Sequence, residues 1–373
     1  MARAPAMQDF EALPEADRLE GFPHPRETTV LLGHEAAEAD LAAAFADGRM
    51  HHAWLFAGRA GIGKATLAYR FARYALARPH ERDLAGPSLD VPADCTAARQ
   101  IMALSHPGLL VLRRPYDSKT KRFATTIPVD EVRRLKSFLG LTSGDDAWRV
   151  VIVDAADDLN ANAANALLKS LEEPPRRAMF LLVTSQPSGL LPTIRSRCRR
   201  LDLRALAAPV LRQAAETALT ASNMELPSTS QWEQLEQLAG GSVRRALQLT
   251  ATGGLELNQR IADIFAQLPQ IDWTAVHTLA DSLAGSAQEQ RYEAFFELVL
   301  DSLAQLTRVR ATGQGSPEQV SLATRLIPEV SLRQWAGLWE ALLRAKADAD
   351  EFNLDRKALI MRAFSMLEAI SKH

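Results

Sequence analysis

The sequence predicts an α/β domain with a parallel β-sheet, followed by two regions that are entirely helical. Three short apolar segments with helix-like segments between them favour the parallel sheet, and strand-like segments stop after residue 204. Of the 373 residues, 47% are hydrophobic and 24% are charged, as in an ordinary globular protein. The length favours two or three domains, and the composition excludes a wholly disordered chain.

The three apolar segments are apolar on both faces, as expected for strands in a sheet that helices cover on both sides. They are Ala53–Ala57, Val150–Val153 and Met179–Val183. Helix-like segments follow the first two, at Ala65–Ala77 and Asn162–Leu171. This alternation is typical of a parallel sheet, because parallel strands need a crossover connection between them.

The part of the chain after residue 204 has the signals of helices. We expect helices at Leu211–Leu219 and Ser230–Thr250, a break at Gly240–Gly241 and a linker at Gly253–Gly254. Apolar residues then recur with the spacing of one helix face: Tyr292, Phe295, Phe296, Val299, Leu300, Leu303 and Leu306. The predicted parts are a loosely ordered extension (1–22), an α/β domain (23–204), a helical lid (205–254) and an all-α C-terminal domain (255–373).

Charge and cysteine content exclude several classes of protein. With 43 Lys and Arg against 45 Asp and Glu, the net charge of −2 gives no overall attraction to nucleic acid. No apolar run approaches the roughly 20 residues that cross a bilayer, and the first residues lack the apolar core of a secretory signal. Two distant cysteines, Cys95 and Cys198, exclude a disulfide framework and a four-cysteine zinc site. We therefore expect a cytoplasmic protein with no membrane partner.

A phosphate-binding loop follows the first predicted strand. Residues 58–64 fit the pattern G-x-x-x-x-G-K, with glycines at Gly58, Gly61 and Gly63 and the lysine at Lys64. Glycines let backbone N–H groups curl around an anion, and the start of the following helix adds favourable partial charge. The alternative is a glycine-rich turn with a solvent-facing lysine. The strand before and the helix after favour the nucleotide site.

Two parts of an ATP-hydrolysing site are missing. The residue after the lysine should carry a hydroxyl that holds Mg²⁺, but it is Ala65, and Thr66 lies about 100° further round the helix. Asp154 ends the second strand, where a magnesium nucleotide would lie, yet Ala155 follows it and cannot accept a proton from water. Asp157 is further along, where we expect it to cap a helix. We expect no efficient ATPase activity from the isolated chain.

Three segments together resemble the clamp-loader branch of the AAA+ proteins. They are L-L-K-S-L-E-E-P-P at 167–175, Phe180–Ser185, and S-R-C at 196–198. The order and separation of the first and last are specific to that branch. The similarity is clearest over residues 28–250, and beyond them it rests on helical content and on Phe352–Arg356.

The resemblance implies an AAA+ P-loop domain, a helical lid and an all-α collar in a pentameric machine that places a sliding clamp on primed DNA. The implied partners are the other clamp-loader subunits (the motor subunits and delta), the sliding clamp and primed DNA. Because the ATP site is degenerate, the implied role is a non-motor stator within a DNA-directed DNA polymerase (nucleotidyltransferase) holoenzyme. The alternative is an ATP-hydrolysing motor subunit of a clamp loader. A P-loop kinase is disfavoured by S-R-C and by the helical C-terminal region.

The resemblance also implies roles for three side chains. Arg197 would act in trans as an arginine finger on a neighbouring ATP site; alternatively it caps the preceding helix or pairs with an acid of its own chain. Thr184 would sense the γ-phosphate, or is a hydroxyl bonded to backbone. Arg244 matches the lid arginine, although the residue before its helix, Ser242, fits an ordinary helix cap.

No cofactor is expected to be required, and ATP or ADP would bind weakly at most. Many relatives of this branch carry a four-cysteine zinc module between the phosphate-loop helix and the next strand, whereas this region retains only Cys95 here. His106 is near but cannot complete a tetrahedral site, so we predict no zinc. His51 and His52 enter a strand, where neighbours point to opposite faces, so we expect no shared metal ion.

Overall fold

The computed structural model describes residues 14–82, 88–140, 147–328, 331–352 and 354–372. The chain divides into two compact units, with the boundary between residues 247 and 248. Within the described residues, no helix is long and apolar enough to cross a membrane. The boundaries expected at residues 22, 204 and 254 stay predictions.

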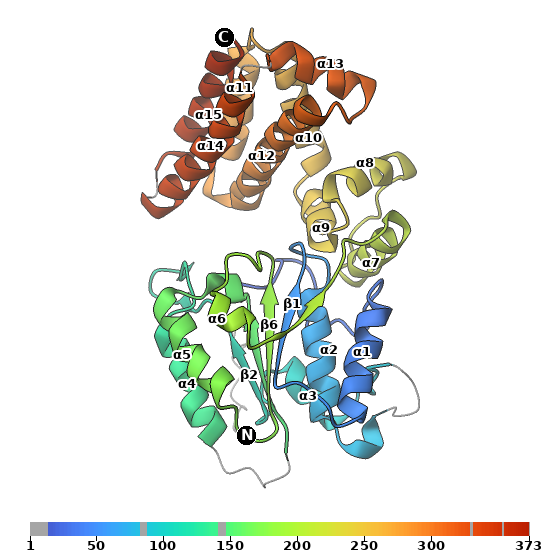
Figure 1. Cartoon of the computed structure of the whole chain (residues 1–373). Helices are drawn as coiled ribbons and strands as arrows, with labels where there is room; N and C mark the ends of the chain where they lie inside the picture. Colours follow the sequence, from blue (N-terminus) through green and yellow to red (C-terminus); the bar gives the residue numbers. More distant parts are fainter. Residues whose placement is uncertain (1–13, 83–87, 141–146, 329–330, 353, 373) are drawn as a thin grey trace, which may run out of the picture. The chain divides into compact units, whose positions relative to one another are not determined.

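The first unit is built on a five-stranded parallel sheet in the order β2-β5-β6-β1-β7 (Figure 1). The strands are β1 (Ala53–Ala57), β2 (Leu109–Leu112), β5 (Arg149–Asp154), β6 (Ala178–Thr184) and β7 (Arg199–Asp202). The three predicted strands are confirmed as the three central ones, β5, β6 and β1. A small antiparallel pair, β3 (Tyr116–Asp117) and β4 (Arg122–Phe123), lies outside this sheet.

Helices cover both faces of this sheet, as the apolar strands predicted. One face packs against α1 (Glu35–Ala46) and α2 (Lys64–Leu76), and the other against α4 (Val129–Gly140) and α5 (Ala161–Glu172) (Figure 1). Shorter helices connect the layers: η1 (Pro79–Glu81), α3 (Thr96–Met102), η2 (Ala156–Asp158) and α6 (Pro192–Arg195). The predicted α/β fold class is confirmed.

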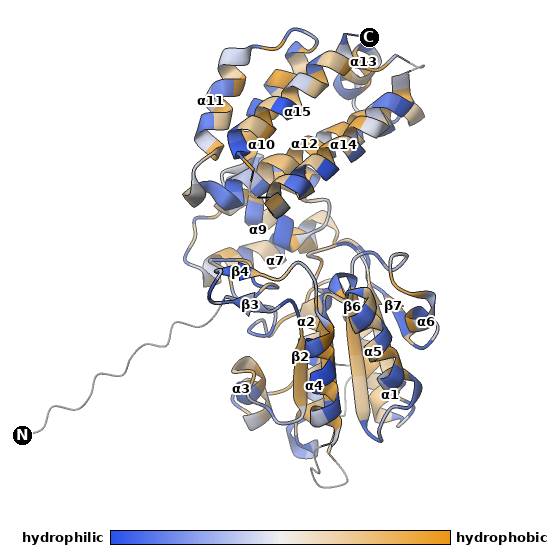
Figure 2. Cartoon of the chain, turned by 90° about the vertical axis from the view of Figure 1, so that its left-hand side faces the viewer, coloured by the Kyte–Doolittle hydropathy of each residue, from blue (hydrophilic) through white to orange (hydrophobic). Residues whose placement is uncertain are grey.

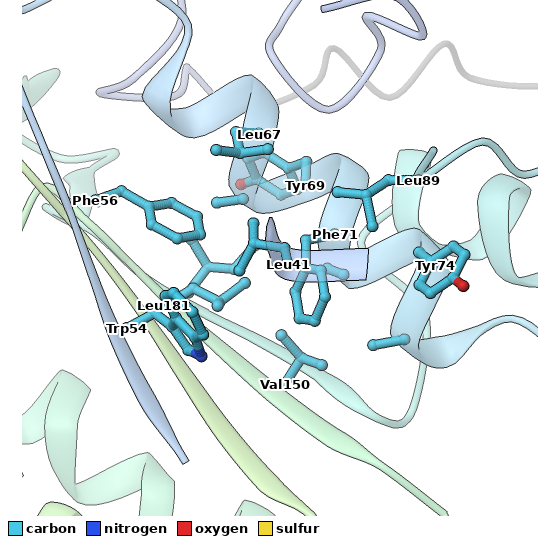
Figure 3. Close-up of a cluster of buried hydrophobic side chains, with 14 of the residues drawn as sticks. Leu41, Trp54, Phe56, Leu67, Tyr69, Phe71, Tyr74, Leu89, Val150 and Leu181 are labelled. Carbon is cyan, nitrogen blue, oxygen red and sulfur yellow. The ribbon is translucent and has the colours of Figure 1, made fainter. Parts of the chain in front are cut away.

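Alternate residues of each strand enter different cores. Trp54 and Phe56 of β1 pack with Leu67 and Phe71 of α2, and none of these side chains is more than 1% exposed (Figure 3). Leu55, between the first two, points to the opposite core beneath α5. In Figure 2 the strands are orange along their length whereas α4 carries blue residues, which is the pattern of a sheet sealed from water by amphipathic helices.

Helices alone follow β7 among the described residues of this unit. They are α7 (Ala208–Ala221), α8 (Thr229–Ala239) and the start of α9 (Val243–Ala251). Gly240 and Gly241 break the predicted long helix, with φ of 54° and 81°, conformations that favour glycine. The expected linker at Gly253–Gly254 is instead a short turn, because Gly253 caps the next helix.

The second unit is all-α where it is described. Its helices are α10 (Gly254–Gln267), α11 (Trp273–Leu283), η3 (Ser286–Gln288), α12 (Glu289–Thr312), α13 (Pro317–Leu326), α14 (Leu332–Phe352) and α15 (Arg356–Ser371). The predicted apolar face of α12 is buried at Phe295, Val299 and Leu303, each 0% exposed. Phe295 also contacts Phe364 of α15, at 5.8 Å between ring centroids. This unit therefore has a core of its own.

Candidate functional site

The predicted phosphate loop connects β1 to α2 at the carboxyl edge of the sheet. Gly58, Gly61 and Gly63 all have positive φ, at 150°, 75° and 108°. A Cβ atom at Gly58 would lie 2.4 Å from the carbonyl oxygen of Leu203, and one at Gly61 would lie 2.3 Å from Oγ of Ser242. Both conformation and close packing therefore require glycine at these two positions.

Lys64 bonds to its own loop. The side chain is buried, and its Nζ donates hydrogen bonds to the carbonyl oxygens of Gly58, at 2.7 Å, and Arg59, and to Oγ of Ser185, at 3.2 Å. Burial lowers the pKa of Lys64 to about 8, although the nearby carboxylates of Asp154 and Asp157 oppose this change. The ammonium group of Lys64 thus donates to oxygens of the protein, and a bound anion would have to compete with them for these hydrogen bonds.

Asp154 ends β5 beside this loop, as predicted. Its Oδ2 atom is buried and has no hydrogen-bond partner among the described residues. Burial raises the pKa of Asp154 to about 7, the charge of Asp17 adds to this, and Lys64 opposes it. Ala155 follows, so the position of the catalytic base in an ATPase holds a methyl group.

Asp157 joins the ends of two neighbouring strands instead of capping a helix. Its carboxylate accepts hydrogen bonds from the hydroxyl of Thr184 and, at 2.6 Å, from the backbone N–H of Ser185. The cap expected of Asp157 is wrong, because the side chain of Asn160 caps α5. Thr184 is fully buried; its hydroxyl donates to this carboxylate and accepts from the backbone N–H of Gln186 at 3.1 Å.

The predicted lid arginine lies against the N-terminal part of the chain. Arg244 Nη1 donates to the carbonyl oxygen of Asp17 at 2.9 Å, and Nη2 to that of Arg18 at 3.4 Å. The Asp17 carboxylate lies 2.9 Å from Nη1 of Arg113 and 2.8 Å from Nε2 of His24. Ser242 fits the alternative role of a helix cap, because its Oγ accepts a hydrogen bond from the backbone N–H of Arg245 at 3.3 Å.

The sequence predicts a loosely ordered extension over residues 1–22. Residues 1–13 lie outside the described residues, and residues 14–22 are held by side-chain contacts instead. Glu15 accepts hydrogen bonds from both Arg26 and Arg113, each at 2.7 Å. Burial alone would raise the pKa of Glu15, but these two arginines lower it to about 2. Ion pairs, together with the buried side chain of Phe22, therefore hold this segment in place. The sequence pattern missed it because charged residues on an unstructured-looking segment do not indicate their partners.

Arg197 makes both contacts of its alternative role. Nη2 lies 2.7 Å from Oε1 of Glu172, and Nη1 donates to the carbonyl oxygen of Thr193 in α6 at 2.9 Å. The side chain is still 34% exposed. Thr66, the remaining predicted site residue, is half-buried in the first turn of α2.

The cysteine and histidine residues have local roles. Cys95 caps α3, its Sγ accepting the backbone N–H of Ala98 at 3.3 Å. The prediction that His51 and His52 point to opposite faces is wrong: their rings stack, with centroids 4.4 Å apart, because residues 51–52 precede the regular strand. Across the described residues, no three His, Cys, Asp or Glu side chains form a group suited to a metal ion.

Known proteins share this sequence pattern over most of its length. A family model described as DNA polymerase III, delta subunit, matches residues 33–207. The delta-prime subunit of DNA polymerase III from Escherichia coli is 31% identical over 281 residues, which cover 73% of this chain and 78% of that protein. This chain belongs to the DNA polymerase III delta-prime family.

Other members and neighbours of this family match over different spans. The delta-prime subunit from Pseudomonas aeruginosa is 36% identical over 213 residues, so the match spans only 60% of that relative and 57% of this chain. The tau subunit from Escherichia coli is 30% identical over 72% of this chain and 39% of its own length. A gamma-subunit-related protein from Thermotoga maritima has a TM-score of 0.44 at 19% identity, covering 90% of this chain and 99% of that one.

Replacing Asp154 with Asn should stabilise the protein most at high pH. The pKa of Asp154 is about 7 in the folded protein against an ordinary value of 3.8, so the folded state holds a proton that the unfolded chain releases between these values. Stability from this group is therefore lost as the pH rises from about 4 to 7. At pH 8 we expect Asp154→Asn to raise the free energy of unfolding by about 2 kcal/mol, because the amide removes the cost of ionising a buried carboxyl group in the folded state.

Urea unfolding of both proteins at pH 4.5 and pH 8 measures this difference. At pH 4.5 the gain should be small, because Asp154 is already neutral in the folded protein. Asp157→Asn is the matched control: its carboxylate accepts hydrogen bonds from Thr184 and Ser185, so the substitution should destabilise. An equal gain from Asp154→Asn at both pH values would contradict the assignment.

Proposed function

We propose that this protein is a non-motor stator subunit of a DNA polymerase III clamp loader, which helps to place the sliding clamp on primed DNA. Its partners are then the motor subunits, delta, the clamp and the DNA, in the cytoplasm. Within that complex it supplies Arg197 as an arginine finger to a neighbouring ATP site. Membership of the delta-prime family supports the assembly, and the state of the chain's own site supports the non-motor role.

The observation that carries the non-motor role is the set of hydrogen bonds made by two cationic side chains of the site, Lys64 and Arg244. The Lys64 ammonium donates to carbonyl oxygens of its own loop, and the Arg244 guanidinium donates to those of Asp17 and Arg18. A nucleotide would have to displace both sets of hydrogen bonds before its phosphates could be bound. Ala65 and Ala155 then leave it without a magnesium hydroxyl ligand and without a base.

The motor-subunit alternative requires efficient hydrolysis at this site. The phosphate loop itself is intact in backbone conformation, which is what favours that alternative. Backbone alone, however, supplies binding and not water activation. We therefore retain the non-motor role and expect any ATP or ADP binding to be weak, with no cofactor required.

We expect the purified chain to bind MgATP with a Kd weaker than about 1 mM, a binding free energy of less than about 4 kcal/mol. Titration calorimetry of the full chain tests this value. Ala65→Ser combined with Ala155→Glu should still hydrolyse slowly, since Lys64 and Arg244 stay engaged. Adding Asp17→Ala removes the ion pairs with Arg113 and His24 that hold this segment in place. The backbone of residue 17 should then release Arg244 more easily, and nucleotide binding in that background should be stronger.

Micromolar MgATP binding by the native chain would overturn the degenerate-site proposal. So would a normal ATPase turnover of the native chain without partners. Asp90→Ala, which removes an exposed carboxylate elsewhere on the same unit, is the matched control for Asp17→Ala and should leave nucleotide binding unchanged.

A further inference from the structure

A second concave site lies beside the carboxyl-terminal half of α2. Its cavity has a volume of about 640 Å³, within the usual range of about 300–1,000 Å³ for small-molecule sites. The apolar part of its lining includes Val30, Leu89, Val91 and Pro92. Arg73 lines it nine residues after Lys64, or roughly 14 Å along the helix, so it is separate from the phosphate loop.

Arg73 is a buried cation that has no acidic partner in the described part of the chain. The side chain is 6% exposed, and within the described residues no carboxylate lies at ion-pair distance from it. Nη2 donates to the carbonyl oxygen of Thr28 at 2.6 Å, but Nε is buried and has no hydrogen-bond partner there. Burial, together with the charge of Arg70, lowers the pKa of Arg73 to about 10, so the group is still charged at neutral pH.

The neighbouring Arg70 lines the same cavity, and its charge is paired with acidic side chains. It pairs with Glu38, lies 2.8 Å from Asp90 and donates to the carbonyl oxygen of Thr29. Buried charges are costly unless they are paired and hydrogen-bonded, and Arg70 meets this condition while Arg73 does not. Among the described residues, Arg73 therefore lacks the acidic partner that Arg70 has.

Arg82 brings a second guanidinium to the cavity. It donates from Nη2 to the carbonyl oxygens of Ala75, at 2.8 Å, and Ala77, and it lies over the ring of Phe45 at 5.0 Å from the centroid. Its Nε is also buried without a hydrogen-bond partner among the described residues. Two guanidiniums, each with a buried N–H donor that has no partner among the described residues, thus line one cavity. Two carboxylates line it as well, but Glu81 accepts the backbone N–H of Arg78 and Asp90 pairs with Arg70.

We propose that this cavity binds a small organic anion, with a phosphate or carboxylate head on Arg73 and Arg82 and an apolar body against Val30, Leu89 and Val91. The N–H donors of a guanidinium match the oxygens of either head. The depth of Arg73 favours a small molecule over the backbone of a nucleic acid, which could not enter a cavity of this size. The site is independent of the degenerate nucleotide site and of the proposed function.

The test uses phenyl phosphate and phenylacetate as probes, titrated calorimetrically into the full chain. We expect at least one to bind, and phenol, which lacks the anionic head, to bind at least tenfold more weakly. Arg73→Met should weaken probe binding about tenfold or more, since a charge-assisted hydrogen bond is lost. Comparing the two probes shows which head the site prefers.

Three further variants locate the bound probe on the molecule. Ala93→Trp places a bulky side chain in the lining of the cavity and keeps every arginine, so it should also weaken binding, which covers the case in which Arg73→Met does not fold. Arg49→Met removes an exposed arginine elsewhere and should have no effect. Lys64→Met disables the phosphate loop and should leave probe binding intact.

Two results would overturn the proposal. One is the absence of binding by the native chain at millimolar concentrations of both probes. The other is binding that Lys64→Met abolishes while Arg73→Met and Ala93→Trp leave it unchanged, since that would place the anion on the phosphate loop.

Discussion

Arg197→Ala should lower the DNA-stimulated ATPase activity of the assembled clamp loader while leaving the fold and assembly of this chain intact. Arginine fingers contribute about 10³–10⁵-fold in other phosphoryl-transfer enzymes, so the one ATP site that we propose for Arg197 should lose activity on that scale. The total activity of the loader should fall less, because its other sites continue to hydrolyse. Site-resolved single-turnover hydrolysis with purified loader, clamp and primed DNA measures the effect.

The contacts of Arg197 make a sharp control possible. In the single chain it pairs with Glu172, and both side chains are at least one third exposed, so the pair contributes about 0–1 kcal/mol of stability. Glu172→Gln breaks that pair but keeps the guanidinium, and should leave hydrolysis unchanged. Arg195→Ala removes a neighbouring exposed arginine of α6 and should also have no effect.

The conservative substitution separates charge from geometry. Arg197→Lys should restore hydrolysis poorly, because an ammonium lacks the planar fork of donors that a guanidinium offers to phosphate oxygens. If Arg197→Ala loaders hydrolyse ATP at the normal rate, or if Glu172→Gln causes the same loss as Arg197→Ala, Arg197 is a surface residue and the finger proposal fails.

Deleting residues 256–373 should abolish entry of this chain into the clamp loader while the α/β domain stays folded. The first unit has its own two cores, one on each face of the sheet, and loses no strand in the deletion. The deleted helices have a separate core around Phe295 and Phe364, which fits the collar that we predict for them.

Size-exclusion chromatography of the reconstituted loader measures the stoichiometry, and the near-UV circular dichroism of Trp54, buried in the sheet, reports the fold of the first unit. An internal control is Leu343→Ser, which changes one exposed apolar residue of α14 and should leave assembly intact. The collar assignment would be rejected if the truncated chain entered the complex at normal stoichiometry.

The strands show where sequence patterns succeed and where they do not. β1, β5 and β6 lie inside the sheet, are covered on both faces and are therefore apolar at nearly every position. β7 is an edge strand with the sequence Arg199-Arg200-Leu201-Asp202, and its exposed residues need not be apolar. Its assignment depends on backbone pairing with β1, which no local pattern of residues reports.

The candidate site divides in the same way. The positions of Gly58, Gly63 and Lys64 follow from their spacing, and the losses at Ala65 and Ala155 follow from residue identity. The residues that these groups contact do not follow from spacing or residue identity. Arg244 meets the carbonyl oxygen of Asp17 across 227 positions of sequence, and Arg113 meets the carboxylate across 96.

The α/β class, the phosphate-loop pattern, its missing hydroxyl and base, and the relationship to clamp loaders could all be predicted from the sequence, because each depends on local spacing or residue identity. Only the three-dimensional structure shows that the ion-paired segment around Asp17 lies against Arg244 and that Lys64 bonds its own loop. It also shows that Arg73 is buried with no acidic partner among the described residues. This is because the strength of an electrostatic interaction depends on the distance between two groups in space and not on their separation in the sequence. Charged residues carry no periodic signal that would identify those partners in advance.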